Sequence, residues 1–256
     1  MGTKFFTNQG SNTLLEKFKG IFNNNPDIVQ FDALIGYLRS SGYFAIHKNI
    51  TKLDKVRIIV GIDVDKLLAD YTKRGLLFTP NESAVVLEVD RQITDDIQTA
   101  FYSSEIENGI QQFIEDVQSG KVEIKAHPKR KLHAKVYVFL PKGFNEHKAG
   151  AVITGSSNLT AAGLGAEEQE SNYEFNVLMH YYEDVKFAKD EFQRLWDESI
   201  AVLPEVITGI KKKTFLGAEL TPLDLYYKLL QEYFGTSIDY DPNYGFEFLK
   251  RIYMLK

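Results

Sequence analysis

The sequence predicts an α/β fold, in which a mixed β-sheet is flanked by helices and followed by a helical extension. Short apolar runs of strand length recur along the chain, for example KVRIIVG at 55–61 and AVIT at 151–154. Between these runs, apolar residues repeat at spacings of three and four, which indicates amphipathic helices. The alternation of the two patterns favours a sheet with helices packed on its faces.

The first part of the chain predicts one helix and two strands. Residues 28–38 are mostly apolar and predict a buried strand that enters a turn at Ser40, Ser41 and Gly42. Residues 55–61 predict a second strand. The preceding helix is predicted from apolar side chains at helical spacing, namely Leu14, Leu15, Phe18, Ile21 and Phe22.

Two helices and three strands are predicted in the middle of the chain. A stripe of apolar residues between 106 and 117 predicts a helix packed on the core, and a second stripe between 181 and 195 predicts a helix that covers the sheet. The strands are predicted at 136–139, 151–154 and 175–178. We therefore expect one large domain over residues 1–203.

From about residue 204 the sequence changes character. Thr221, Pro222 and Asp224 form a strong helix start, with a capping hydroxyl, a proline in the first helical position and an acid in the first turn. A long apolar face follows. Residues 204–256 are therefore predicted to be a helical linker outside the main domain.

Polar residues gather at the ends of the three middle strands. His133 and Lys135 precede one strand, Ser156 and Asn158 follow the next, and Glu174 precedes the third. Since residues two apart in a strand point to the same face, the imidazole and the ammonium should project side by side. Chemistry on a phosphodiester needs a nucleophile or acid, fixed positive charge and donors to the phosphate oxygens. These strand ends are therefore the candidate site.

The pattern H-x-K followed by G-S-x-N resembles the signature of the phospholipase D superfamily. His133, Lys135, Gly155, Ser156 and Asn158 match that signature. The segments IVQFDALIGYLRSSG, KVRIIVG and TPLDLYYKLLQEYFG are also similar to the phospholipase D-like nuclease domain found at the N-terminus of two-lobed helicases. The resemblance implies a phospholipase D-like sheet and a helicase domain in cis, which is absent from this chain. We expect the chain to be the N-terminal piece of a longer protein.

Two features depart from the family pattern. Where the signature carries an aspartate, this chain has Leu140, which removes support behind the phosphate-contacting residues. The connection between the two motif halves is also long, and residues 141–150 are expected to form an extended hairpin loop. Glu174, in an N-x-E sequence, resembles a further acidic residue of the family. A charge on an edge strand is an equally good interpretation of Glu174.

The resemblance implies a two-step hydrolysis that uses neither metal nor cofactor. One histidine attacks phosphorus and forms a phosphohistidine, a second histidine protonates the leaving oxygen, and water completes the reaction. Lys135 and Asn158 would hold the non-bridging oxygens, with Ser156 and Glu174 in the same catalytic set. The family site uses two H-x-K units and this chain has one. The resemblance therefore implies a homodimer.

A basic strip leads into the candidate site. Six basic residues and one acid fall between 121 and 135, in a chain whose net charge is −5. Such a strip would concentrate a polyanion, so Lys129, Arg130, Lys131 and, in the turn, Ser157 are predicted to contact nucleic acid, with DNA the expected partner. A solvated loop before a strand, and a simple capped turn formed by Ser156, Ser157 and Asn158, remain open as alternatives.

Composition narrows the class of protein. The chain of 256 residues has no cysteine, no apolar run long enough to span a bilayer, and no phosphate-binding loop of the ATPase type. We therefore expect a cytoplasmic protein that does not hydrolyse ATP, and a lipid-active phospholipase ranks last. Two hypotheses remain: a metal-independent nuclease module, or a catalytically silent module that binds nucleic acid and dimerises.

Overall fold

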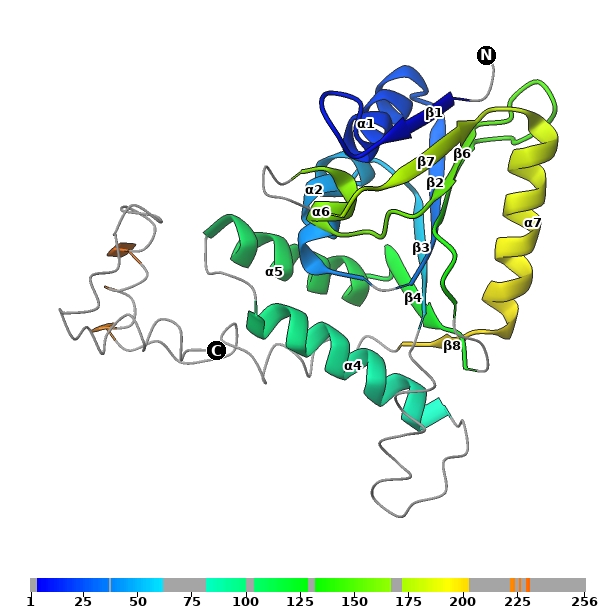
Figure 1. Cartoon of the computed structure of the whole chain (residues 1–256). Helices are drawn as coiled ribbons and strands as arrows, with labels where there is room; N and C mark the ends of the chain where they lie inside the picture. The colour runs from blue at the N-terminus through cyan, green and yellow to red at the C-terminus, as the bar shows by residue number, and fades with distance from the viewer. Residues whose placement is uncertain are drawn as a thin grey trace.

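The computed structural model describes residues 4–36, 38–61, 82–99, 104–128, 132–166 and 172–202, together with 222, 223, 226, 229 and 230. Within these ranges the chain forms an eight-stranded mixed sheet flanked by helices, as expected from the sequence (Figure 1). The elements in chain order are β1 Lys4–Thr7, α1 Leu14–Asn24, β2 Ile28–Ile35, α2 Ser40–Ile50, β3 Lys55–Val60, α4 Glu82–Thr99, α5 Ser104–Gln118, β4 Val122–Ala126, β5 Val136–Pro141, β6 Ala151–Gly155, α6 Ala161–Leu164, β7 Phe175–Met179, α7 Tyr182–Glu198 and β8 Ile200–Ala201.

The sheet topology brings distant parts of the chain to one end of the sheet, where strands begin or stop; this end is called the site edge, or simply the edge, below. The strand order is β1-β7-β6-β5-β2-β3-β4-β8, with β2, β3 and β4 parallel to one another and the other neighbours antiparallel. The end of β6 therefore lies beside the starts of β5 and β7, and the end of β2 meets the same edge. All the polar strand ends singled out from the sequence share this edge.

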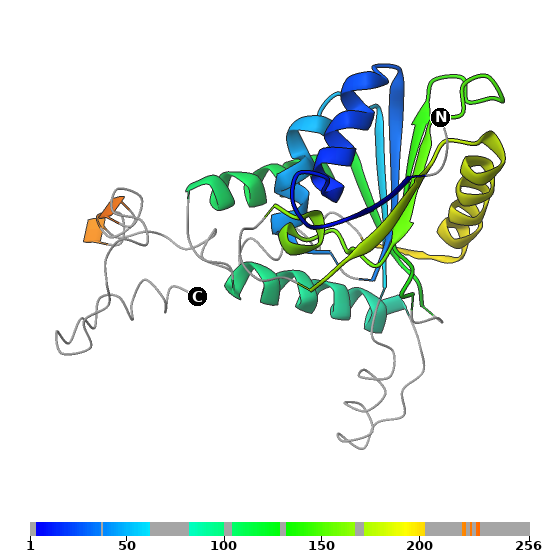
Figure 2. The same cartoon turned by 45° about the horizontal axis from the view of Figure 1, so that its top comes forward.

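The helices cover the two faces of the sheet unequally. Apolar side chains of α1, α2, α4, α5 and α6 join the main core on one face, while α7 packs alone on the other (Figures 1 and 2). On the crowded face, the Phe18 ring contacts Phe31, Tyr137 and Phe139 at centroid distances of 5.1 to 5.6 Å. Aromatic side chains from α1, β2 and β5 thus fix the strands that carry the site.

A buried ion pair attaches α7 to the sheet. Arg57 of β3 donates to both carboxylate oxygens of Asp32 at 2.8 and 2.6 Å, and to Gln193 Oε1 at 2.7 Å. Its guanidinium lies 4.9 Å from the Phe192 ring centroid and 5.1 Å from that of Trp196. A planar, delocalised cation suits both contacts at once. Arg57 therefore links two strands and one helix.

Most sequence-predicted elements are confirmed, and one is wrong. Helices α1, α5 and α7 and the strands β3, β5, β6 and β7 lie where the patterns place them. The strand expected over 28–38 ends at Ile35, and Ser40 begins α2 instead of a turn. The first turn of α2 can pack this closely against Leu159 because Gly42 has no Cβ. A Cβ at position 42 would lie 2.2 Å from the Leu159 carbonyl oxygen. Packing against the G-S-S-N loop thus overrides the local turn signal.

The predicted C-terminal linker falls mostly outside the described residues. Pro222 and Leu223 are helical, at the place where the capping pattern starts a helix. The boundary between 203 and 204 stays a prediction. In the ranges that the structure describes, no helix has the length and apolarity needed to cross a membrane.

Candidate active site

The H-x-K pair lies in an extended segment just before β5. Lys135 Nζ lies 3.1 Å from His133 Nε2 and 3.2 Å from Nδ1, and donates to the His133 carbonyl oxygen at 2.8 Å. His133 is exposed, whereas Lys135 is buried. The side-by-side arrangement expected from strand alternation is therefore present, with the imidazole at the surface and the cation beneath it.

Burial gives the Lys135 amino group unusual electrostatics. Loss of hydration lowers its pKa below the ordinary value of 10.5, and the carboxylate of Glu174 opposes part of that effect. The same carboxylate and burial raise the pKa of Tyr137 well above its usual range, burial being the larger cause. Glu174 thus interacts electrostatically with Lys135 and Tyr137, while its role in the site stays a prediction.

The loop after β6 supplies an amide at this edge. Asn158 accepts at Oδ1 a hydrogen bond from the Gly36 backbone N–H at 3.0 Å, which fixes the orientation of the amide. Ser156 is held to the start of β7: its N–H donates to the Phe175 carbonyl at 3.1 Å, and its Oγ accepts from the Phe175 N–H at 3.0 Å. The loop is therefore fixed at both ends.

Ser157 differs from the neighbouring loop residues because its side chain is 0% exposed. Its Oγ accepts from Asn176 Nδ2 at 2.9 Å, and its carbonyl accepts from the buried Tyr137 hydroxyl at 2.8 Å. A side chain in this position is not at the surface where nucleic acid would lie. We therefore assign Ser157 to support of the loop rather than to the nucleic-acid contact expected from the sequence.

Glu174 is positioned by a residue far away in the chain. The Glu174 backbone N–H donates to Asn8 Oδ1 at 3.0 Å, and Asn8 Nδ2 donates to the Asn172 carbonyl at 2.8 Å. Asn8 follows β1, so the N-terminal edge strand fixes the segment that enters β7. Sequence reasoning missed this role, because no local pattern connects positions separated by more than 160 residues.

Gly36 is a second residue that sequence reasoning missed. It follows β2, and a Cβ there would lie 3.1 Å from Asn158 Oδ1 and 3.7 Å from Lys135 Nζ. Glycine therefore keeps open the corner where the lysine and the amide approach each other. No local pattern marks it, because its partner Asn158 is 122 positions away in the chain.

At the position where the family signature carries an aspartate, Leu140 is buried in an apolar cluster. Its neighbours are Val138, Val152 and Val185, the last from α7. This position therefore stabilises the contact between α7 and the sheet. The connection after β5 forms the expected hairpin, closed by a bridge between Asn145 and Lys148.

The basic strip is interrupted by intramolecular contacts. Lys129, Arg130 and Lys131 lie outside the described residues. Lys121 donates to the Thr51 carbonyl at 2.8 Å, and Lys125 donates to the Trp196 carbonyl at 2.9 Å while lying 4.7 Å from that ring. Lys121 and Lys125 therefore hold elements together, and only the three residues between 129 and 131 remain as the predicted phosphate contacts.

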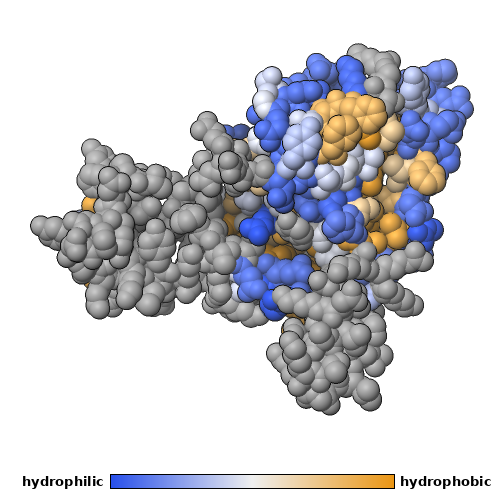
Figure 3. Space-filling view, in the orientation of Figure 1, coloured by the Kyte–Doolittle hydropathy of each residue, from blue (hydrophilic) through white to orange (hydrophobic). Residues whose placement is uncertain are grey.

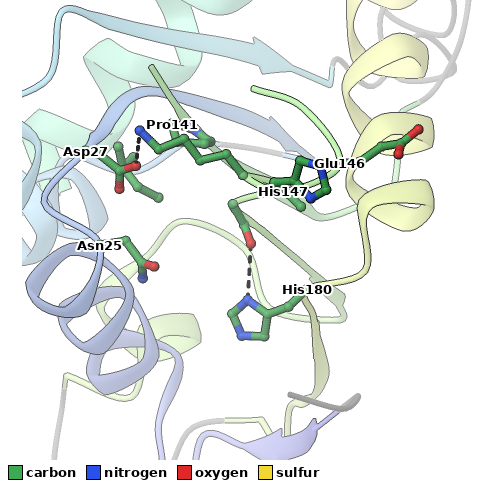
Figure 4. Close-up of a pocket in the computed structure, with 10 residues that line it drawn as sticks. Asn25, Asp27, Pro141, Glu146, His147 and His180 are labelled. Atoms are coloured by element: carbon green, nitrogen blue, oxygen red, sulfur yellow. Dashed lines mark hydrogen bonds and ion pairs between the residues drawn. The ribbon is translucent and has the colours of Figure 1, made fainter. Parts of the chain in front are cut away.

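A separate cavity of about 320 Å³ lies at the opposite edge of the sheet (Figure 4). There Lys148 Nζ pairs with Asp27 Oδ2 at 2.7 Å, and His180 Nδ1 lies 3.2 Å from the Gly150 carbonyl oxygen. His147 also lines this cavity.

In the part of the chain that the structure describes, no three His, Cys, Asp or Glu side chains form a group able to hold a metal ion.

Comparisons with known proteins identify relatives of this fold. A family model described as "Cardiolipin synthase, PLD-like domain" matches residues 45–196, a stretch that holds His133, Lys135, Ser156, Asn158 and Glu174. A search of curated proteins found no match.

Several solved structures are similar to this chain. Nuc, a phospholipase D family member from Salmonella typhimurium, is 11% identical, with 78% of this chain and 97% of that chain covered and a TM-score of 0.43. NucT from Helicobacter pylori is 13% identical, with 78% and 99% covered and a TM-score of 0.38. Phosphatidylserine synthase from Haemophilus influenzae Rd KW20 is 15% identical, with 82% and 44% covered and a TM-score of 0.45.

Proposed function

Because this chain belongs to the PLD-like domain family of the phospholipase D superfamily, we propose that it is a phosphodiesterase that hydrolyses nucleic acid. The observation that carries the proposal is the convergence of a surface imidazole, a buried ammonium and a fixed amide. His133 and Lys135 are in contact, and Lys135 and Asn158 border the same open corner at Gly36. These groups match the needs of phosphoryl transfer.

The proposed reaction has two steps. A His133 ring nitrogen attacks phosphorus, the bond to the leaving oxygen breaks, and a phosphohistidine forms. Water then attacks the same phosphorus, breaks the P–N bond and releases the second product. Lys135 and Asn158 hold the non-bridging oxygens while negative charge develops on them, with Ser156 and Glu174 at the rim. No step requires a metal.

The leaving oxygen needs a proton, and a second imidazole is the proposed donor. None of the other four histidines is placed to serve as this donor. His127 follows β4 at the same end of the sheet, but it is buried, lies 3.5 Å from Glu198, and is separated from β2 by β3, whereas His47 lies 3.3 Å from Asp116. His147 and His180 line the cavity at the opposite edge. We therefore propose a homodimer in which His133 of each copy faces the other across a two-fold axis.

The proposed context is a nuclease module attached in cis to a helicase domain and acting on DNA in the cytoplasm. This rests on the resemblance of residues 28–42, 55–61 and 221–235 to the corresponding parts of helicase-associated nuclease domains. The linker is then residues 204–256. Reading the gene downstream of the codon for Lys256 tests this directly. A downstream sequence that encodes no phosphate-binding loop of the ATPase type would contradict the proposal.

A cleavage assay in EDTA tests the activity. Wild-type protein should cleave a labelled oligonucleotide. If the reaction is stopped by denaturation during turnover, the protein should carry covalently bound label. His133→Ala should abolish both signals, since it removes the nucleophile. His147→Ala is the matched control, because His147 is exposed at the opposite edge, and it should cleave normally. Cleavage that needs added Mg²⁺ or Mn²⁺ would contradict the mechanism.

A catalytically silent module that binds nucleic acid and dimerises is the second candidate. The specific observation in its favour is Leu140, which places a buried apolar side chain where the family signature has an acid. Such a module would bind an oligonucleotide and leave it intact under all conditions. In such a module the Lys135 ammonium would still contact phosphate, although no cleavage follows. Its removal in Lys135→Ala should therefore weaken binding.

A further inference from the structure

An exposed aromatic patch lies beside the candidate active site. It consists of Phe5 in β1, Phe175 in β7 and Tyr173, which are 66%, 52% and 67% exposed. The two phenylalanine rings are stacked, with centroids 5.5 Å apart and an interplanar angle of 30°. An apolar area over β1 and β7 is visible at the surface in Figure 3. A single exposed aromatic is common, but a stacked pair of exposed phenylalanines, with an exposed tyrosine two residues before one of them in the chain, indicates a binding surface.

The patch is a part of the sheet that α7 leaves uncovered. Along β7, Asn176 and Leu178 are buried toward the main core, so Phe175 points to the opposite face, where α7 packs. Phe5 lies on that same face, because its neighbour Phe6 is buried in the core. Helix α7 covers Val138 and Val152 but leaves both phenylalanines exposed.

The patch is continuous with the site through the backbone. Phe175 exchanges two hydrogen bonds with Ser156, and it directly follows Glu174. Since successive residues of a strand point to opposite faces, Glu174 and Phe175 lie on either side of the thin sheet edge. A polymer whose phosphate lies at His133 would reach Phe175 by crossing that edge.

We propose that Phe5, Tyr173 and Phe175 stack against unpaired bases of a single-stranded nucleic acid, which makes single strands the preferred substrate class. This inference rests on the proposed nuclease function. Every base presents a flat aromatic face, so stacking contributes affinity without selecting a sequence. In a duplex those faces are covered by neighbouring base pairs. The patch therefore distinguishes single strands from duplexes, while the site itself contacts only phosphate.

Contact between two copies of the chain explains the exposed patch less well than base stacking does. Lys135 lies on the side of Tyr137 and Phe139, which face the main core, whereas the patch is on the side of α7. The dimer contact proposed at His133 is therefore not on the face that carries the patch. Docking of a second copy there does not require the three aromatic residues.

Binding measurements with three ligands of equal length test the inference. They are a labelled single strand, an abasic single strand with the same phosphates, and a duplex. All proteins carry His133→Ala to prevent turnover. The test variant adds Phe5→Ser and Phe175→Ser, and the control adds Phe187→Ser, which removes a 73% exposed phenylalanine from α7. All three substitutions are at the surface, so the fold should survive.

The parent should bind the single strand more tightly than the abasic strand. The double substitution should weaken binding of the normal strand by on the order of tenfold or more and leave abasic binding unchanged. The Phe187→Ser control should match the parent. Equal affinity of the parent for normal and abasic strands would overturn the stacking inference while leaving the nuclease proposal intact.

Two further outcomes would also overturn the inference. If the double substitution weakens binding of both strands equally and converts the protein to a monomer in light scattering, the patch is a self-association surface. If the parent binds none of the three ligands, the nuclease proposal itself fails, and the stacking inference fails with it.

Discussion

The backbone N–H of Gly36 donates a hydrogen bond of 3.0 Å to Asn158 Oδ1, across 122 positions of sequence. The bond joins the end of β2 to the loop after β6, so it holds the Asn158 amide at the corner that Lys135 also borders. Position 36 is also tight, because a Cβ there would lie 3.1 Å from Asn158 Oδ1, and the amide would have to shift to accommodate it.

Gly36→Ala should therefore reduce activity while preserving the fold. The added methyl would lie 3.1 Å from Asn158 Oδ1 and so shifts the amide, and a misplacement of about 1 Å in a catalytic group costs about 100-fold in rate. The measurement is kcat/KM together with a thermal melting curve. Gly20→Ala is the matched control, because a Cβ at Gly20 in α1 meets nothing within 4 Å. The control should keep full activity and gain roughly 0.5–1 kcal/mol of stability. Full activity in Gly36→Ala would disprove the role of this corner.

Mixing subunits tests whether two copies share one site. If each site needs His133 from both chains, a mixed dimer of wild type and His133→Ala is inactive. After subunit exchange at constant total protein, activity should fall with the square of the wild-type fraction. A linear fall would show that each chain works alone. Mixing with His147→Ala, altered at the opposite edge, should leave activity constant.

Burial of Lys135 should reduce the stability of the protein at neutral pH. Because its pKa is lowered by burial, the unfolded chain binds more protons than the folded chain between that lowered pKa and the ordinary value of 10.5. Stability contributed by this group therefore rises with pH across that window. Lys135→Met should be inactive yet more resistant to denaturant at pH 7, and its advantage should shrink at about pH 10. An equal gain at both pH values would contradict this explanation.

Local spacing in the sequence identified residues that gather at one end of the sheet, but not the contacts that hold them there. His133, Lys135, Ser156, Asn158 and Glu174 carry signals that depend on local spacing, and the antiparallel topology brings them to one edge. Gly36 and Asn8 act through contacts across 122 and more than 160 positions, which no local pattern encodes.

Errors in the fold have a similar cause. Ser40, Ser41 and Gly42 are turn formers in isolation, but the close approach of Gly42 to Leu159 favours a helix start. From the sequence, Lys121 and Lys125 belong to a free basic strip. In the structure, Lys121 donates to the carbonyl of Thr51 after α2, and Lys125 donates to the carbonyl of Trp196 in α7. Tertiary contacts decide both cases.

The Arg57–Asp32 pair should be essential to the attachment of α7. Arg57→Met leaves the Asp32 carboxylate buried without its partner, and breaking such a pair costs about 3–5 kcal/mol. Urea denaturation measures the loss. Lys186→Ala removes a surface cation that pairs with Asp190 on the same helix, and it should leave stability nearly unchanged. Equal effects of the two substitutions would show that the buried pair is not the anchor.

Replacement of Lys129, Arg130 and Lys131 by Ala should weaken binding of single-stranded nucleic acid and flatten its dependence on salt. These three cations directly precede the site in an acidic protein, and two other lysines of the strip are engaged elsewhere. Each lost phosphate contact lowers the slope of log K against log salt by about 0.7 to 0.9, so three contacts change it by roughly two to three. Fluorescence anisotropy over a range of salt concentrations gives the slope.

The control for this triple substitution must change the net charge equally. Replacement of Lys186, Lys189 and Arg194 by Ala removes three cations from α7, where each is paired with an acid of the same helix. If long-range charge alone drives binding, both triple variants should show similar losses. If 129–131 contact phosphate, only the first should lower the slope. An unchanged slope in the first variant would show that the residues ahead of His133 form a solvated loop and that the polyanion enters the site by another route.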